Sequence, residues 1–154
     1  MSLRERLSEA LKTAMRAKDQ PTVDAVRMII AKLKEKDIEA RGRGVTDGIG
    51  EDEMLSMMQG MIKQRRESIE LYDKGGRPEL ADKERAEIAI IEGFLPKQMS
   101  EEEAMAVIRG VVAETGAASV KDMGKVMAEL KARYAGQMDF SKASGLVKQA
   151  LSGN

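Results

Sequence analysis

The sequence predicts an all-α protein, with an N-terminal domain of four helices followed by a small three-helix C-terminal domain. Apolar residues recur at intervals of three and four through most of the chain, with charged residues between them. Glycine, proline and capping residues separate these periodic stretches. The chain changes element between residues 96 and 100, so we expect domains at 1–96 and 97–154. Its 154 residues suffice for one moderate domain and one small one.

The first two helices have clear boundary signals. Ser2 and Glu5 have the spacing of a capping box, and the helix that follows is expected to end near Lys18. Pro21 then marks the start of a second helix, which continues to Gly42. The apolar positions of that second helix are Val23, Val26, Ile29, Ile30 and Leu33. Such an amphipathic helix needs partners to cover its apolar face.

Residues 42–50 contain four glycines and little apolar material, so they are expected to form a mobile loop. Arg41 and Arg43 lie in an arginine-glycine patch, a composition that can contact RNA. Three acidic residues lie beside them, at Asp47, Glu51 and Asp52. We therefore favour a plain loop over an RNA contact.

A helix hairpin is predicted from Glu51 to Leu95. The third helix should end near Lys74, and its inner face is the row Met54, Met58, Ile62, Arg65, Ile69 and Tyr72. Gly75 and Gly76 supply the left-handed conformation that ends a helix, and Pro78 suits the first turn of the next. The row of the fourth helix is Leu80, Glu84, Ile88, Ile91 and Leu95.

Each row of the hairpin contains one charged residue, Arg65 in the third helix and Glu84 in the fourth. Folding the hairpin about Gly76 places Arg65 opposite Glu87 and within a turn of Glu84. We therefore predict a partly buried ion pair. It could be catalytic, but we favour a structural role, because no histidine or nucleophile accompanies it and such pairs often fix the register of packed helices.

The third helix also carries four methionines, at positions 54, 57, 58 and 61. Methionine side chains can form an adaptable binding surface, and they can equally fill an irregular core. We favour the core interpretation.

Three short helices are predicted after Pro96. The first follows a capping box at Ser100 and stops at Gly116. The second is capped by Ser119 and ends near Gly136, and the third is capped by Asp139. A core this small would be marginal alone, so we expect it to lean on the larger domain.

The composition excludes several chemistries. The chain has neither cysteine nor histidine, so disulfides, the usual zinc sites and Ser-His or Cys-His pairs cannot be built. We therefore predict no catalytic residues, metal or cofactor. Lys+Arg and Asp+Glu balance at 26 each, so any nucleic-acid contact must be local. The N-terminus does not have the pattern of a signal peptide and no run reaches membrane-spanning length, so we expect a cytoplasmic protein.

Several segments closely resemble the GatB/YqeY family. They are VRMIIAKLKEKDIEA at 26–40, IKQRRESIELYDKGGRPELADKERAEI at 62–88, FLPKQMSEEE at 94–103, MGKVMAEL and the closing VKQAL. That family comprises small YqeY-like proteins and the C-terminal tail of the B subunit of glutamyl/aspartyl-tRNA amidotransferase. The resemblance implies the same division into a helical N-terminal domain and a small three-helix C-terminal domain.

The resemblance also bears on function. In the amidotransferase, the chemistry belongs to another subunit and to the body of the B subunit, whereas the tail engages tRNA. The chain matches the tail alone, with no Walker-type phosphate loop and no Ser-Ser-Lys glutaminase arrangement. The resemblance therefore implies that the chain is a tRNA-interacting module that is not catalytic alone. The alternatives are a protein-interaction adaptor and a carbon–nitrogen ligase that uses glutamine as amide donor.

A local excess of three positive charges follows Val120, where three acidic residues accompany six basic ones. The six candidates for nucleic-acid contact are Lys121, Lys125, Lys131, Arg133, Lys142 and Lys148. Composition alone favours a solvated helix face over a contact with nucleic acid. The family resemblance brings the two interpretations close to equal weight. Tyr134 and Phe140 could stack on bases, although Phe140 lies in an apolar row and fits the core better.

Overall fold

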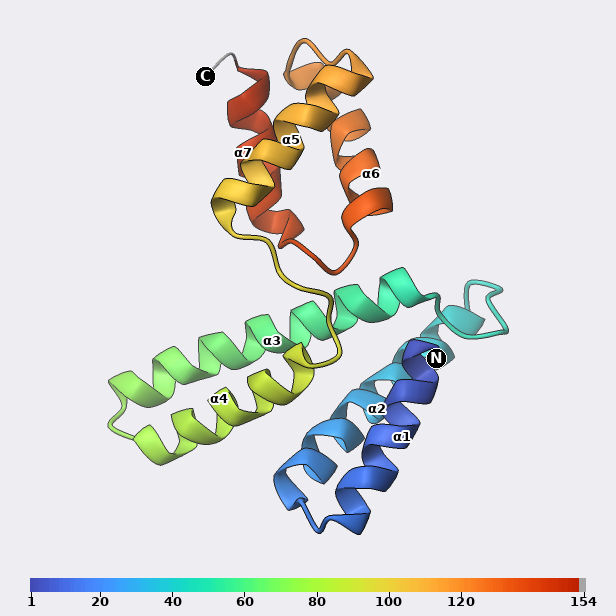
Figure 1. Ribbon diagram of the computed structural model, residues 1–154, viewed down its shortest axis with the longest axis vertical. Coiled ribbons are helices and arrows are strands. Elements are labelled where there is room, and N and C mark those ends of the chain that lie inside the picture. Colours follow the sequence, from blue (N-terminus) through green and yellow to red (C-terminus); the bar gives the residue numbers. More distant parts are fainter. Residues whose placement is uncertain (153–154) are drawn as a thin grey trace. The chain divides into compact units, whose positions relative to one another are not determined.

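The computed structural model describes residues 1–152, which form seven α-helices and one short 3-10 helix, with no strand among them (Figure 1). The predicted all-α fold is confirmed. Contacts between Cα atoms group the chain into two compact units, one of Met1–Pro96 and one that begins at Lys97. The first unit holds α1–α4 and the second holds α5–α7. Residues 153 and 154 of the predicted C-terminal domain lie outside the described residues.

Helices α1 (Leu3–Arg16) and α2 (Gln20–Arg41) pack against each other across a tight turn (Figure 1). The capping box of Ser2 and Glu5 is present at the start of α1. Lys18 takes a left-handed φ of 56°, and the next residue caps α2 through its side chain. Helix α1 therefore ends two residues before the predicted Lys18, because the chain must reverse within that turn.

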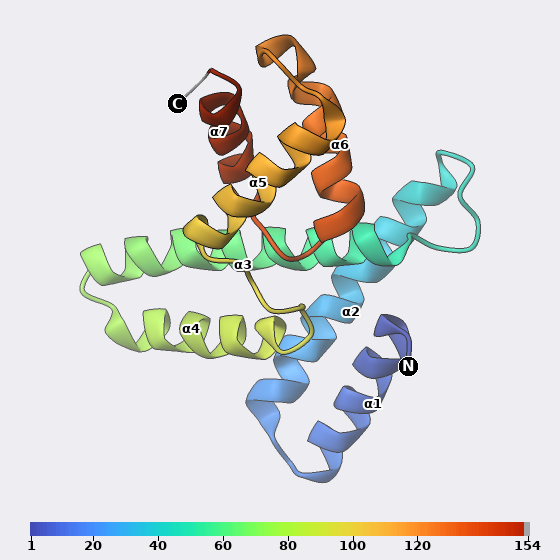
Figure 2. The ribbon, with the colours of Figure 1, turned by 45° about the horizontal axis from the view of Figure 1, so that its top comes forward.

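Helices α3 (Glu51–Lys74) and α4 (Pro78–Glu92) form the predicted hairpin, and they lie side by side along their lengths (Figure 2). Only Gly76 is left-handed, at φ 71°, whereas Gly75 has an ordinary φ of −83°. The predicted left-handed end of the helix is confirmed, and Gly76 alone supplies it. One left-handed residue suffices here because the next N–H, of Arg77, already reaches back to the Tyr72 carbonyl at 2.8 Å.

The core of the first unit is formed by the inner faces of its four helices. Helix α2 packs on α4 and, less extensively, on α3. All four methionines of α3 are buried, with 8% or less of each exposed, so their interpretation as core residues is confirmed. The other large apolar residues of this core include Leu3, Leu7, Val26, Ile29, Leu33, Ile62, Ile88, Ile91 and Phe94.

The loop between α2 and α3 is anchored at one point. Arg4 of α1 donates two hydrogen bonds of 2.9 Å to the Asp37 carboxylate of α2 and one of 3.1 Å to the Ile49 carbonyl. The Ile49 N–H in turn donates to Asp37 at 2.9 Å, and the Ile49 side chain is buried in the core. We call these three residues the Arg4 clasp. It joins α1, α2 and the end of a loop that was expected to be mobile.

Hydrogen bonding in the Arg4 clasp changes the acidity of its carboxyl group. The Arg4 guanidinium, aided by the Ile49 N–H, lowers the pKa of Asp37 to about 2. Asp37 therefore stays ionised over the ordinary pH range and holds the clasp closed.

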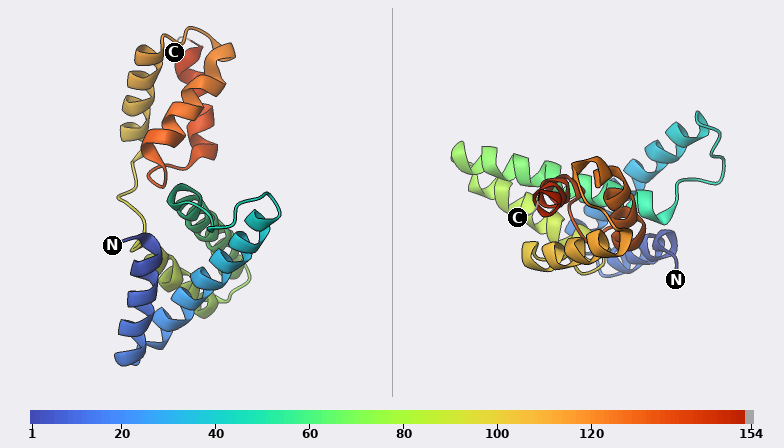
Figure 3. Two further views of the ribbon diagram at one scale, coloured as in Figure 1. Left: turned by 90° about the vertical axis from the view of Figure 1, so that its right-hand side faces the viewer. Right: turned by 90° about the horizontal axis from the view of Figure 1, so that it is seen from above.

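The second unit is a three-helix bundle in which every helix packs on the other two (Figure 3). Its elements are α5 (Glu101–Thr115), the 3-10 helix η1 (Val120–Asp122), α6 (Met123–Tyr134) and α7 (Phe140–Leu151). The expected capping box at Ser100 and the left-handed Gly116 bound α5. The side chain of Asp139 caps α7, as predicted.

The second helix of this unit begins differently from the prediction. After Ser119 the chain makes the 3-10 turn η1 before α6 starts at Met123. The Asp122 carboxylate accepts the N–H groups of Ala118 and Ser119, at 2.9 and 3.3 Å, and so closes a tighter turn. These bonds also lower the pKa of Asp122.

The core of the second unit collects one apolar stripe from each helix. Its largest fully buried residues are Ile108, Val111, Val126, Leu130 and Val147. Tyr134 and Phe140 are partly buried and pack against this core. Neither unit contains, over residues 1–152, a helix long and apolar enough to cross a membrane.

Replacement of Gly48 by alanine tests the Arg4 clasp. Gly48 has φ +89°, and a Cβ there would lie 2.6 Å from Arg4 Nη2, so the guanidinium must move away. Gly44 is the matched control, because it has φ +83° with nothing within 4 Å of its Cβ position. Each alanine costs about 1–2 kcal/mol for the left-handed backbone, and Gly48→Ala about 1 kcal/mol more. Equal free energies of unfolding in urea for the two variants would contradict the clasp.

The Asp37→Asn variant tests the charge of the clasp. A carboxyl whose pKa is lowered by folding stabilises the protein above the unfolded-state pKa of 3.8, and this contribution disappears as the pH falls towards about 2. Asp37 is 18% exposed and Arg4 40%, so solvent screening reduces the expected loss to about 1–2 kcal/mol at neutral pH. Urea unfolding should show that loss at pH 7 and little difference at pH 2. The Glu9→Gln control, in an exposed pair with Lys12, should change little at either pH.

Candidate functional site

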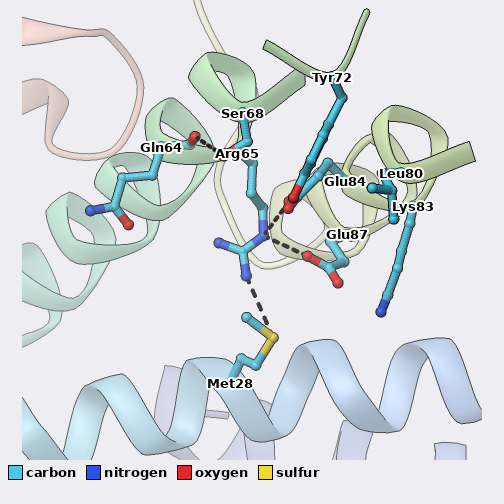
Figure 4. A pocket seen from close by; sticks show the side chains of 9 residues that line it. All are labelled: Met28, Gln64, Arg65, Ser68, Tyr72, Leu80, Lys83, Glu84 and Glu87. Carbon is cyan, nitrogen blue, oxygen red and sulfur yellow. Dashed lines mark hydrogen bonds and ion pairs between the residues drawn. The ribbon is translucent and has the colours of Figure 1, made fainter. Parts of the chain in front are cut away.

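An open pocket of about 430 Å³ lies in the first unit, lined by residues of α2, α3 and α4 (Figure 4). We call it the Arg65 pocket. Its polar lining comes from α3 and α4 and includes Arg65, Tyr72, Glu84 and Glu87. Met28 of α2 lines the side opposite α3, as Figure 4 shows.

Arg65 has the only buried charged side chain among residues 1–152, with 7% of the residue exposed. Its Nε donates to Glu87 Oε2 at 2.9 Å and lies 3.7 Å from Glu84 Oε2. Nη1 donates to the Met61 carbonyl at 3.2 Å, and Nη2 faces the Met28 sulfur at 3.6 Å. The structure thus brings together the three residues that the sequence grouped, with Glu87 closer than Glu84.

The two glutamates differ in their surroundings. Glu87 is hydrogen-bonded to Arg65, whereas the 3.7 Å separation of Glu84 from Arg65 is too long for a hydrogen bond. Burial raises the pKa of Glu84, and the neighbouring Glu87 carboxylate raises it further, against the opposing effect of Arg65. The two carboxylates share one buried guanidinium, and the exposed Lys83 also lines the pocket, so the charges of the four side chains balance when both glutamates are ionised.

The Arg65 pocket contains no Ser-His or Cys-His nucleophilic pair. The sequence contains no histidine or cysteine that could activate a nucleophile or act as one. Ser68 donates its hydroxyl to the Gln64 carbonyl of its own helix at 3.2 Å. Over residues 1–152, no group of three or more His, Cys, Asp or Glu side chains is placed to hold a metal ion.

All six predicted nucleic-acid contacts lie on the surface of the second unit, but two of them have partners. Lys125 donates to the Thr115 carbonyl at 2.9 Å. Arg133 pairs with Glu114 of α5 and, at 3.0 Å, with Glu129 of its own helix, and these contacts raise its pKa. Within residues 1–152 the other four have no hydrogen bond or ion pair: Lys121, Lys131, Lys142 and Lys148.

The basic residues are dispersed around the second unit instead of forming one cluster. Lys131 and Arg133 are two positions apart on α6, which separates them by about 200° around the helix. Lys142 and Lys148 are six positions apart on α7, which separates them by about 120°. Within each helix, the two basic residues therefore face different directions.

The structure also places two features that were considered for RNA contact, the aromatic rings of the second unit and the arginine-glycine patch. Tyr134 packs against the core of the second unit, as Phe140 does, which leaves less of each ring for stacking on bases. Arg43 lies 3.5 Å from Glu53, and both Arg41 and Arg43 are exposed on the loop side of α2.

Two features of the first unit have no recognisable signal in the sequence. Met28 was not singled out, although it lies in an apolar stretch of α2 and is 44% exposed. A partly exposed methionine beside a buried charge is visible only when α2 and α3 are placed together. The Arg4 clasp was missed because its three residues are far apart in the sequence, at positions 4, 37 and 49.

The chain is thus a small all-α protein of two helical units. It has a pocket of mixed charge on the first unit, exposed basic residues on the second, and no histidine or cysteine for a Ser-His or Cys-His pair. The sequence model of the family described as Yqey-like protein matches residues 4–151. The chain therefore belongs to the YqeY-like family, and the predicted family resemblance is confirmed in that part.

Similar proteins are found in fungi under the name altered inheritance of mitochondria protein 41, mitochondrial. The one from Eremothecium gossypii is 34% identical over 89 residues, 58% of this chain and 46% of that protein. The one from Lachancea thermotolerans has the same identity and coverage. The Pyrenophora tritici-repentis protein is 29% identical over 133 residues, 83% of this chain and 71% of that protein. The chain thus spans about half the length of the first two relatives.

Replacing Arg65 by methionine tests the role of the ion pair. The change leaves Glu84 and Glu87 partly buried without their cation, so the free energy of unfolding should fall by about 3–5 kcal/mol. Glutamine at both positions 84 and 87 should recover most of that loss in the Arg65→Met background, because no uncompensated charge remains. Arg66 is the control, since it is 65% exposed and Arg66→Met should cost less than about 1 kcal/mol.

The same variants separate a structural role of Arg65 from a functional one. If Arg65→Met stays as stable as the parent protein in urea but loses a measured activity such as RNA binding, the structural interpretation is wrong.

Proposed function

We propose that this chain is a tRNA-interacting helical module that is non-catalytic alone and uses its second unit for the contact. The observation that carries the proposal is the set of four exposed lysines without protein partners on that unit, at positions 121, 131, 142 and 148. Each can place an ammonium group on a phosphate without first breaking an ion pair.

The proposal involves phosphates more than bases. The four lysines lie on η1, α6 and α7, which suits contacts to a curved backbone, and the two aromatic rings are partly buried against the core. Such contacts give affinity that depends strongly on salt and little on sequence. The resemblance of the segments at 123–130 and 147–151 to the amidotransferase tail supports tRNA as the RNA class.

Two alternatives have less support. A protein-interaction adaptor built on the methionine-bearing helix loses its basis, because Met54, Met57, Met58 and Met61 are core residues. An adaptor that uses the basic helices remains the second candidate. A glutamine-dependent carbon–nitrogen ligase has no catalytic group to support it, and we expect the purified chain to show no such amidation. We also propose that the protein acts in the cytoplasm.

The proposal is tested by a tRNA titration at two salt concentrations. The parent protein should bind at low salt and lose affinity as salt rises, since bound phosphates release counterions. A variant with Lys121, Lys131, Lys142 and Lys148 changed to glutamine should lose at least about tenfold in affinity at low salt. Its slope of log K against log salt should be shallower by about 3, at roughly 0.7–0.9 per lost phosphate contact.

The matched control changes Lys34, Lys63 and Lys74 to glutamine, three exposed lysines of the first unit. This variant should bind nearly as the parent does. Negligible binding of the parent at low salt, or equal loss in both variants, would refute the proposal. Capture of a stoichiometric protein partner by the second unit without RNA would favour the adaptor.

A further inference from the structure

One carboxylate of the Arg65 pocket accepts no hydrogen bond from the buried guanidinium. Glu84 accepts no hydrogen bond from Arg65, since the separation is 3.7 Å, and its side chain is 22% exposed towards the pocket. Glu87, in contrast, is 14% exposed and already bonded at 2.9 Å. The Glu84 carboxylate is therefore the group in this pocket that a ligand can reach and satisfy.

A second polar group lines the same space. The Tyr72 side chain extends from α3 towards the pocket, on the same side as Glu84 in Figure 4. A phenol oxygen can accept one hydrogen bond while it donates another. Glu84 and Tyr72 together offer acceptors to a ligand that carries several N–H groups.

The charges around the pocket favour a cation. Arg65 is sealed at 7% exposure, with Nε and Nη1 committed to Glu87 and to the Met61 carbonyl. The Arg65 guanidinium therefore contributes to the electrostatic potential of the pocket but offers a ligand little surface for direct contact. With Glu84 and Glu87 both ionised, the two carboxylates balance Arg65 and Lys83, which also lines the pocket. Lys83 is exposed, so water screens its charge more than it screens the partly buried carboxylates. An anionic ligand would meet the two carboxylates first.

The apolar part of the lining suits an alkyl chain. Met28, which is 44% exposed, and Leu80, which is partly exposed, line the pocket beside the charged groups. The methionine is unbranched and flexible, so it can pack along a stem of variable length. A pocket of about 430 Å³ is large enough for a group of the size of an amino-acid side chain.

We propose that the Arg65 pocket binds an alkylguanidinium cation, whose N–H groups donate to Glu84 and Tyr72 while its alkyl stem lies along Met28 and Leu80. The planar guanidinium is favoured over an ammonium because its fork of donors can reach two acceptors at once. The pocket lies in the first unit, so this site is separate in sequence and chemistry from the lysines proposed to contact tRNA.

The test uses butylguanidinium as the probe and the full chain with ¹³C-labelled methionine methyl groups. The Met28 methyl resonance should shift saturably on titration. Butylurea, which has nearly the same shape without the charge, should produce no comparable shift. A second pair of probes, capped Gly-Arg-Gly and capped Gly-citrulline-Gly, decides whether the guanidinium comes from a small molecule or from an arginine of a peptide.

Three variants locate the contact. Glu84→Gln should weaken butylguanidinium binding about tenfold, since it removes the charged acceptor. Tyr72→Phe should weaken it about threefold, as expected for loss of one neutral hydrogen bond. Glu92→Gln is the control, because Glu92 lies on α4 outside the pocket, in an exposed pair with Arg66. This variant should bind butylguanidinium with the affinity of the parent protein. Thermal unfolding of each variant verifies that it is folded.

The results overturn the proposal if no Met28 shift appears at high probe concentration, if butylurea acts as well as butylguanidinium, or if Glu84→Gln binds with parental affinity. Tighter binding of the capped arginine peptide supports a protein partner as the source of the cation. Tighter binding of butylguanidinium supports a small molecule.

Discussion

The first unit depends on one positive charge that lies almost completely out of water. A guanidinium buried to this degree costs several kcal/mol unless carboxylates and carbonyls surround it. Arg65 meets this requirement with Glu87, Glu84 and the Met61 carbonyl. Because the carboxylates come from α4, the ion pair fixes how α4 lies along α3.

The ion pair between Arg65 and the two glutamates lies at the Arg65 pocket, between α3 and α4. Elsewhere the two helices meet through apolar rows and through two exposed ion pairs, Arg66–Glu92 and Arg85–Asp73. The apolar rows tolerate small shifts because hydrophobic contact is not directional. The 2.9 Å hydrogen bond between the charged groups of Arg65 and Glu87 is directional and does not tolerate such shifts. We therefore expect the ion pair to set the register of the two helices more than to add stability.

The two units divide the chemistry of the chain. The first concentrates charge in a partly buried place, where one guanidinium faces two carboxylates and desolvation strengthens every interaction. The second spreads its basic residues over exposed helix faces, where each charge is screened by water and salt. The first arrangement suits recognition of one small group. The second suits weak, additive contacts to a repeated charge such as a phosphate backbone.

The sequence by itself determined the helices, their caps, the hairpin turn and the grouping of Arg65 with Glu84 and Glu87. These features depend on spacings of three and four and on local backbone preferences, which neighbouring residues specify. Only the tertiary structure decided the Arg4 clasp, the place of Met28 beside the guanidinium and the pairing of Arg133 with Glu114. Each of these contacts joins residues on different segments, and no spacing pattern in the sequence predicts such a contact. Side chains from different helices meet only after those helices have packed.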